Sequence, residues 1–165
     1  EARREVVYVS AENAVNANPL LPTAVTLGPI DPLAIAAFKA WHAPTWDWER
    51  YARHYRHARY ARLELAIWAG TELCGLALGK FSPAETVLQM NFVEGAPHAH
   101  PLKGYVLEVA VTHGIILGSA YGSKVFRVTK PGNHVQNALA ALAEPFTFVA
   151  QGPHAPYPYS EWSLP

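Results

Sequence analysis

The segment Val87–Asn137 constrains the fold more than any other part of the chain. It is typical of a strand over Val87–Val93, a loop over residues 94–103, a helix that opens at Gly104, and a second strand over Lys124–Thr129. The first N–H groups of such a helix have no partner inside it, and the helix dipole favours a negative charge there. A glycine at that point lets a ligand approach the backbone closely. The segment therefore predicts a site for the pyrophosphate of a nucleotide-like cofactor.

Three consecutive antiparallel strands are predicted around the beginning of that unit. The runs Leu63–Trp68 and Leu73–Phe81 alternate well enough for strands, and the polar turn 69–72 between them indicates a β-hairpin. A second turn at 82–85 leads from the hairpin into Val87–Val93. We therefore expect a meander of three strands ahead of the helix.

Turn residues, caps and apolar spacing predict the remaining elements. Asp31 is the expected cap of one helix, with Pro32 at its first position, and Thr45 is the expected cap of the next. Residues 1–22 are interpreted as an N-terminal extension, and residues 151–165 as a tail rich in proline and aromatic residues. The predicted elements are an edge strand over Glu5–Ser10, a strand over Thr23–Leu27, helices over about Pro32–His42, Trp46–Tyr60, Gly104–Tyr121 and Asn133–Ala143, and a final strand over Phe146–Ala150.

Composition narrows the class of protein. A chain of 165 residues, half of them hydrophobic, is expected to form one domain. Its zero formal net charge argues against a general nucleic-acid binder, and the single cysteine, Cys74, excludes a disulfide framework or a cysteine zinc cluster. This cysteine usage fits the cytoplasm. The longest apolar stretch, Tyr105–Tyr121, is short for a membrane span and carries Glu108 and His113, so we expect a buried helix and no membrane association.

The order of these elements resembles that of the GNAT superfamily of acyl-CoA-dependent N-acyltransferases over roughly Thr23–Ala150. Three places carry the resemblance. The segment Leu65–Leu78 looks like the second and third strands of the family, with a polar turn and an early glycine. The sequence Pro-Leu-Lys-Gly-Tyr-Val at 101–106 falls where the family has its acyl-CoA pyrophosphate loop. The turn Val128–Asn133, followed by a helix and Phe146, resembles the family's Asn-containing turn and closing aromatic strand.

The resemblance implies an α+β fold with a mixed, mostly antiparallel, twisted central sheet flanked by helices. The sequence also departs from the family pattern. Pro101 stands where the family has Arg or Gln, and Val106 stands where it has a small residue, so only the central Gly104 of that loop is kept. The tyrosine that often acts as an acid on the last helix has no counterpart in the alanine- and leucine-rich segment 138–143.

Acetyl-CoA, or another acyl-CoA, is the cofactor that the resemblance implies. In that interpretation Lys103 adds a positive charge beside the pyrophosphate, the open edge of Val87–Val93 pairs with the pantetheine arm, and Asn133 bonds to the same arm. The alternative is that Gly104 only begins a buried helix and Lys103 is solvated. The predicted cofactor-binding residues are Asn91, Phe92, Val93, Leu102, Lys103, Gly104, Tyr105, Val106 and Asn133.

Amine acylation needs a base, because only the neutral amine attacks. The candidates are Glu94, at the end of the predicted strand, and His98 and His100 in the loop that follows. Histidine titrates near neutrality and could serve without a large change of its pKa. The alternative for each residue is a solvated loop side chain. We expect no metal site at the His-x-His pair, since no third ligand is identifiable.

We therefore expect an N-acetyltransferase that moves an acetyl group from acetyl-CoA to an amine of a small molecule or a protein by direct attack. One alternative is a catalytically inactive GNAT-like binding or assembly module, with the aromatic segment Tyr157–Trp162 in the acceptor cleft or in a dimer interface; a homodimer is left open. A further alternative is a nucleic-acid-associated protein that uses an arginine-rich helix, although a solvated face explains the same spacing. Those arginines are Arg50, Arg53, Arg56, Arg59 and Arg62.

Overall fold

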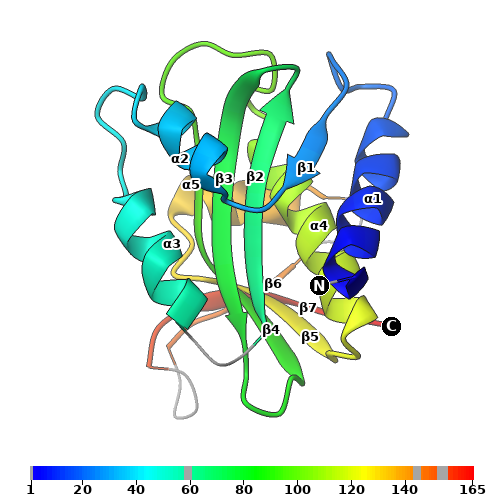
Figure 1. Cartoon of the computed structure of the whole chain (residues 1–165). Helices are drawn as coiled ribbons and strands as arrows, with labels where there is room; N and C mark the ends of the chain where they lie inside the picture. The colour runs from blue at the N-terminus through cyan, green and yellow to red at the C-terminus, as the bar shows by residue number, and fades with distance from the viewer. Residues whose placement is uncertain (1, 58–60, 143–145, 152–155) are drawn as a thin grey trace.

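A computed structural model of the chain describes residues 2–57, 61–142, 146–151 and 156–165 (Figure 1). The helices are α1 (Ala2–Asn16), α2 (Pro32–Phe38), α3 (Trp48–His57), α4 (Val106–Ala120) and α5 (Asn133–Ala140). The strands are β1 (Thr26–Gly28), β2 (Arg62–Ala69), β3 (Glu72–Phe81), β4 (Val87–Gly95), β5 (Val125–Thr129), β6 (Thr147–Val149) and β7 (Tyr159–Ser163).

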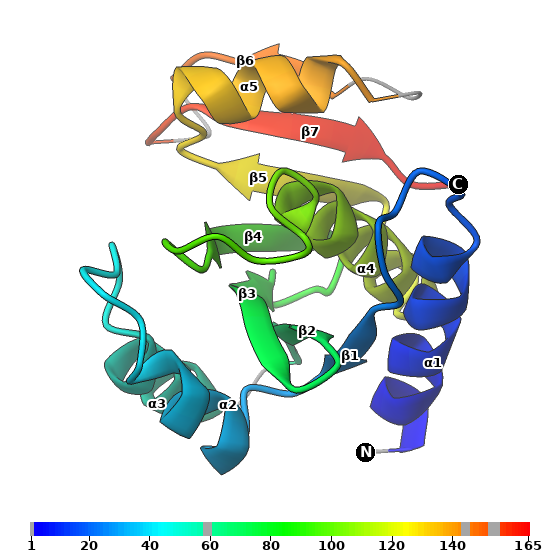
Figure 2. The same cartoon turned by 90° about the horizontal axis from the view of Figure 1, so that it is seen from above.

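Within the described residues the strands form one seven-stranded sheet in the order β1-β2-β3-β4-β5-β7-β6. The pairing of β4 with β5 is parallel, and the other pairings in this part of the chain are antiparallel. Helices α1 and α4 cover one face of the sheet and α2 and α3 cover the other (Figure 2). The predicted mixed, mostly antiparallel sheet with flanking helices is confirmed, as is the meander β2-β3-β4.

The N-terminal segment is a helix, so the predicted edge strand Glu5–Ser10 is wrong. Its valine-rich sequence favours a strand by local propensity. However, Val7, Ala11 and Val15 follow one another at a spacing of four and are buried in the core that α4 shares. Packing on α4 therefore decides the conformation, as is usual where propensity and tertiary contact disagree.

The tail also contains structure that was not predicted. Residues Tyr159–Ser163 form β7, which lies between β5 and β6 and pairs with both. The ring of Trp162 lies 6.0 Å from that of Phe146, and Trp162 packs against the core. This part of the tail therefore belongs to the sheet.

The helix boundaries follow the capping chemistry. Asp31 caps α2 as predicted, since its Oδ1 accepts from the backbone N–H of Ala34 at 2.8 Å. At α3 the cap is Asp47 and not Thr45, because Asp47 Oδ1 accepts from the N–H of Arg50 at 3.1 Å. The predicted ends of the second and last helices, at residues 58–60 and 143, lie outside the described residues. None of the described helices is both long and apolar enough to cross a membrane.

A β-bulge in β4 shapes the region after it. Leu78 of β3 faces Phe92, whereas the next residue, Gly79, faces Met90, so Asn91 is an extra residue in β4. A side chain at Gly79 would overlap the carbonyl oxygen of Gln89, which explains the glycine there. Because the extra residue shifts the alternation by one, Met90 points into the core shared with α4, whereas Phe92 packs on the side of α2 and α3.

The bulge also coincides with the point where two neighbouring strands separate. The parallel pairing of β4 with β5 extends from Val87 to Met90 on β4 and from Val125 to Val128 on β5. In the described structure residues 91–95 of β4 therefore leave the edge that faces β5 unpaired.

Candidate active site

The unpaired edge of β4 borders a groove made of two adjoining cavities. The first, which we call the split cavity, has a volume of about 250 Å³ and lies where β4 and β5 separate. The second, the loop cavity, has a volume of about 390 Å³ and lies beside the start of α4. Both are lined by Val93, Glu94, His134 and Val135. The groove therefore connects the N-terminus of α4 to the strand split.

At the loop cavity the backbone provides donors for an anion. Gly104 has φ +90°, which favours glycine, and a Cβ at this position would meet nothing within 4 Å. Helix α4 follows directly, and its N-cap residue Tyr105 makes no side-chain cap. The Tyr105 side chain therefore caps none of the N–H groups of the first turn. These groups point out of the N-terminus of the helix, where the helix dipole favours an anion. Lys103, Gly104 and Val106 all line this cavity.

Leu102 has a different position from its predicted neighbours in the cofactor loop. It is fully buried and belongs to the core. Burial raises the pKa of the Cys74 thiol, and a backbone hydrogen bond from Leu102 opposes that effect. Cys74 is a buried core residue, as predicted. Leu102 anchors the loop, while Lys103, Gly104 and Val106 line the cavity and Tyr105 does not.

At the strand split Asn91 links three elements. Its Oδ1 accepts from the hydroxyl of Tyr55 on α3 at 3.1 Å, and its Nδ2 donates to Thr129 Oγ1 on β5 at 3.0 Å. Burial raises the pKa of Tyr55 to about 12, and the phenols of Tyr157 and Tyr51 add to this rise. Tyr55 therefore stays a hydrogen-bond donor at neutral pH, and the side chain of Asn91 is held in one orientation.

Aromatic side chains form one wall of the split cavity. The ring of Phe92 lies 5.0 Å from that of Trp46 and 4.5 Å from that of Tyr51. Trp46 and Phe92 line the cavity directly. Tyr51 and Tyr55 are four residues apart on α3, so they lie on one side of that helix, but no local sequence signal connects them with Phe92 on β4.

Glu94 lies at the junction of the two cavities and is held by three donors. Its Oε1 accepts from the backbone N–H of Thr45 at 2.5 Å. Its Oε2 accepts from the N–H of Trp46 at 3.3 Å and from the indole N–H of Trp48 at 2.7 Å. A carboxylate offers about four lone-pair directions, so one remains for a proton or a water in the groove.

The two candidate histidines occupy different surroundings. His98 is exposed, with Nε2 3.2 Å from Glu72 Oε1, and it is not among the residues that line either cavity. His100 lines the loop cavity, and its Nδ1 is buried without a partner among the described residues. Burial lowers the pKa of His100, and Lys103 lowers it further, while Glu72 opposes them. No group of three potential metal ligands occurs in the part of the chain that the structure describes.

The turn after β5 contributes residues that sequence reasoning missed. Asn133, a predicted cofactor contact, is exposed at the start of α5 and does not line either cavity, whereas the next residue, His134, lines both. Lys130 lines the split cavity and has φ +49°. The sequence indicated the Lys-Pro-Gly-Asn turn. It did not indicate which side chains of the turn line the groove.

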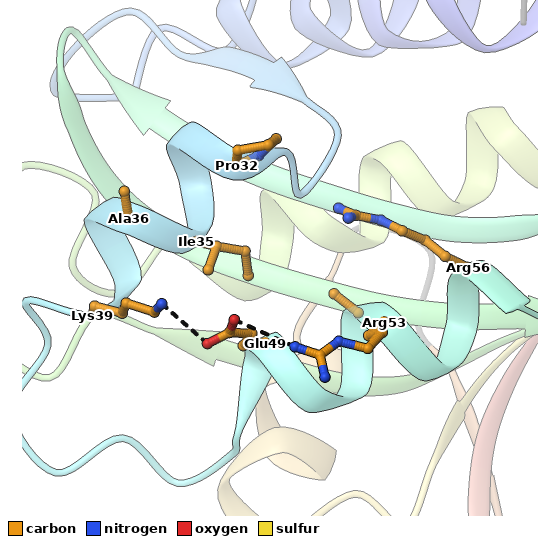
Figure 3. Close-up of a pocket in the computed structure, with 8 residues that line it drawn as sticks. Pro32, Ile35, Ala36, Lys39, Glu49, Arg53 and Arg56 are labelled. Carbon is orange, nitrogen blue, oxygen red and sulfur yellow. Dashed lines mark hydrogen bonds and ion pairs between the residues drawn. The ribbon is translucent and has the colours of Figure 1, made fainter.

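Two of the arginines of α3, Arg53 and Arg56, line a separate cavity of about 380 Å³ between α2 and α3 (Figure 3). There Glu49 pairs with Lys39 at 3.2 Å and with Arg53 at 3.5 Å (Figure 3). Arg56 pairs at 3.2 Å with Glu64, which is 3% exposed. These ion pairs neutralise part of the stripe and so weaken the nucleic-acid alternative. Arg59 lies outside the described residues.

Comparison with known proteins identifies the fold. No family model matches the sequence, and no curated protein does either. Among solved structures, the chain is similar to an acetyltransferase from Thermus thermophilus, with 16% identity, a TM-score of 0.58, and coverage of 87% of this chain and 99% of that one. It is also similar to the N-acetyltransferase PseH of Campylobacter jejuni in complex with acetyl coenzyme A, with 10% identity, a TM-score of 0.57, and coverage of 86% and 99%.

A third similar structure is the ribosomal-protein-S18-alanine N-acetyltransferase of Escherichia coli, with 14% identity, a TM-score of 0.53, and coverage of 86% of this chain and 93% of that one. The chain has the GNAT fold, and the resemblance inferred from the order of its elements is confirmed. Identities this low establish the fold alone.

Proposed function

We propose that this protein is an N-acetyltransferase that transfers an acetyl group from acetyl-CoA to an amine. The observation that carries the proposal is the groove along the unpaired edge of β4, which joins a helix N-terminus to the strand split. One end of this groove suits a pyrophosphate and the other end has room for an amine. Another acyl-CoA would use the same contacts through its CoA part, so the choice of an acetyl group is itself part of the proposal.

The cofactor would lie along the groove in an extended form. The first N–H groups of α4 would bind the pyrophosphate, with Lys103 and His100 beside it. The backbone edge at Asn91, Phe92 and Val93 would bond to the amide groups of pantetheine, in the way that a peptide adds to a sheet edge. The thioester would then reach the split cavity.

The chemistry is a direct transfer. The amine nitrogen bonds to the thioester carbonyl carbon, the C–S bond breaks, and CoA leaves as a thiolate that takes a proton from solvent. Glu94 accepts the proton of the amine, directly or through one water, because it alone of the three candidate bases lines the split cavity. A backbone N–H on the unpaired edge of β4 would stabilise the developing oxyanion. His100 lies at the cofactor end, which fits phosphate binding better than proton transfer.

Calorimetric titration with acetyl-CoA tests the cofactor part of the proposal. We expect saturable binding that Gly104→Ala weakens, because alanine strains the backbone at φ +90° beside the anion site. Gly122→Ala is the matched control, since Gly122 also has a positive φ of +74° and open space around its Cβ. If both variants bind acetyl-CoA as the original protein does, the pyrophosphate site lies elsewhere.

Release of CoA thiol over a panel of amines tests the transfer itself. A second candidate function is a GNAT-fold module that binds CoA without turnover. It is favoured by the absence of a tyrosine, which could act as an acid, from residues 133–140 of α5. Saturable acetyl-CoA binding with no thiol release from any amine would support that candidate and contradict the transferase.

A further inference from the structure

Lys130 occupies an unusual position at the mouth of the split cavity. It follows β5 directly, lines the cavity, and has φ +49°, a conformation that costs a lysine energy. Its backbone N–H donates to the carbonyl oxygen of Pro158 at 2.9 Å, which ties the turn to the segment before β7. The surrounding structure thus fixes the residue against its own backbone preference.

The ammonium group of Lys130 is held but not neutralised. Its Nζ lies 4.8 Å from the ring centroid of Tyr157. Among the described residues no acid lies within ion-pair distance of it, whereas the nearby Arg127 pairs with Glu161 at 2.9 Å. The acid that shares the split cavity, Glu94, is already bonded to backbone and indole donors. Lys130 is an exposed residue that lines the cavity, so it adds a positive charge to the rim of the cavity.

The rest of the cavity limits what can accompany that charge. Trp46 and Phe92 supply an apolar, aromatic wall, and Glu94 supplies a proton acceptor at the end shared with the loop cavity. A volume of about 250 Å³ is just below the usual range for small-molecule sites, which is about 300–1,000 Å³. The phosphates of acyl-CoA would lie at the loop cavity, on the other side of that shared end, so the Lys130 charge is not needed for them.

We propose that the acceptor is a small amine that carries a carboxylate, and that Lys130 binds this carboxylate while an apolar side chain of the acceptor packs on Trp46 and Phe92. This places the acceptor among apolar amino acids. The inference rests on the proposed transferase, because it uses the same cavity for the attacking amine. Lys130 is a specificity-determining residue in this scheme and takes no part in proton transfer.

Three probes that differ only at the carboxylate position test the inference: L-phenylalanine, L-phenylalaninamide and 2-phenylethylamine. We expect kcat/KM for L-phenylalanine to exceed that for the other two by about 10- to 100-fold, the range of one hydrogen bond to a charged group. Lys130→Met should remove this preference and leave the KM for acetyl-CoA unchanged. Lys80→Met, at an exposed lysine on β3, is the matched control and should change neither quantity.

Binding of the same three compounds to the CoA-saturated protein, measured by calorimetry, separates this inference from the proposed function. Carboxylate-dependent binding without thiol release would support the acceptor site and contradict the transferase. Equal binding or equal turnover of all three probes would overturn the role of Lys130. So would a Lys130→Met variant that loses affinity for acetyl-CoA, or no detectable binding of L-phenylalanine at millimolar concentration. If the protein preferred an aminoalkyl phosphate to the amino acid, the proposal that Lys130 binds a carboxylate would be wrong, and the acceptor would carry a phosphate instead.

Discussion

Removing the imidazole of His113 should make the stability of the protein less sensitive to acid. His113 lies on α4, is 2% exposed, and stacks on Tyr8 of α1 with ring centroids 5.2 Å apart. Its Nδ1 has no partner among the described residues. Burial lowers the pKa of His113 to about 3, and the positive charge of Arg4 adds to this effect.

The sign and size of the effect follow from the two pKa values. In the unfolded chain His113 has the ordinary value near 6.5, so between pH 6.5 and about 3 the unfolded state binds the extra proton. Stability is therefore complete above pH 6.5 and is lost as the pH falls toward 3. At pH 5 the loss is 1.5 pH units, which corresponds to about 2 kcal/mol at about 1.4 kcal/mol per unit.

Urea denaturation followed by tryptophan fluorescence at pH 7.5 and pH 5.0 measures this loss. We expect His113→Leu to lose about 2 kcal/mol less than the original protein between the two pH values. His113→Gln should behave in the same way, because glutamine does not titrate. His42→Gln, at an exposed histidine, is the control and should keep the original pH dependence. Equal losses in all four proteins would show that His113 does not titrate as its burial requires.

Three further changes test other features. Gly79→Ala should lower the free energy of unfolding by about 1–3 kcal/mol, because its methyl group would overlap a carbonyl of β4, whereas Gly28→Ala should be nearly neutral; thermal melts compare the two. Glu94→Gln should reduce kcat/KM by about 100- to 10,000-fold with acetyl-CoA affinity unchanged, and unchanged kinetics would exclude it as the base. Tyr55→Phe removes the hydroxyl that donates to Asn91 and should lower the free energy of unfolding, measured by urea denaturation, by about 1 kcal/mol. A change near zero would contradict the importance of this hydrogen bond.

The parts of the fold that were predictable depend on local signals. The hairpin of β2 and β3 follows from alternation around a short polar turn, and the start of α4 from one glycine. Helix α1 and strand β7 were missed because each is decided by distant partners. The valines of α1 favour a strand until α4 is placed beside them, and β7 forms only between β5 and β6.

The same distinction applies to the candidate site. Gly104 and Glu94 could be proposed from the sequence because they stand at the ends of predicted elements. The aromatic wall, by contrast, depends on the bulge at Asn91, which brings Phe92 to the side of α3. The alternation of apolar and polar residues in β4 does not reveal this extra residue, because the bulge arises from the pairing of β4 with β3. Lys130 was missed for a similar reason, since its role depends on where β4 and β5 part.

The position of β7 inside the sheet has a consequence for how the protein is made. Strand β6 pairs with β7 in the described structure, and β7 also pairs with β5. During synthesis β5 and β6 leave the ribosome first, and each exposes an unpaired backbone edge until residues 159–163 follow. At about 5–20 residues per second the interval is roughly 1–3 s for β6, which ends 14 residues before Ser163, and roughly 2–7 s for β5, which ends 34 residues before it. For that time the nascent chain is open to pairing with another chain, and a stall before Ser163 would prolong the exposure.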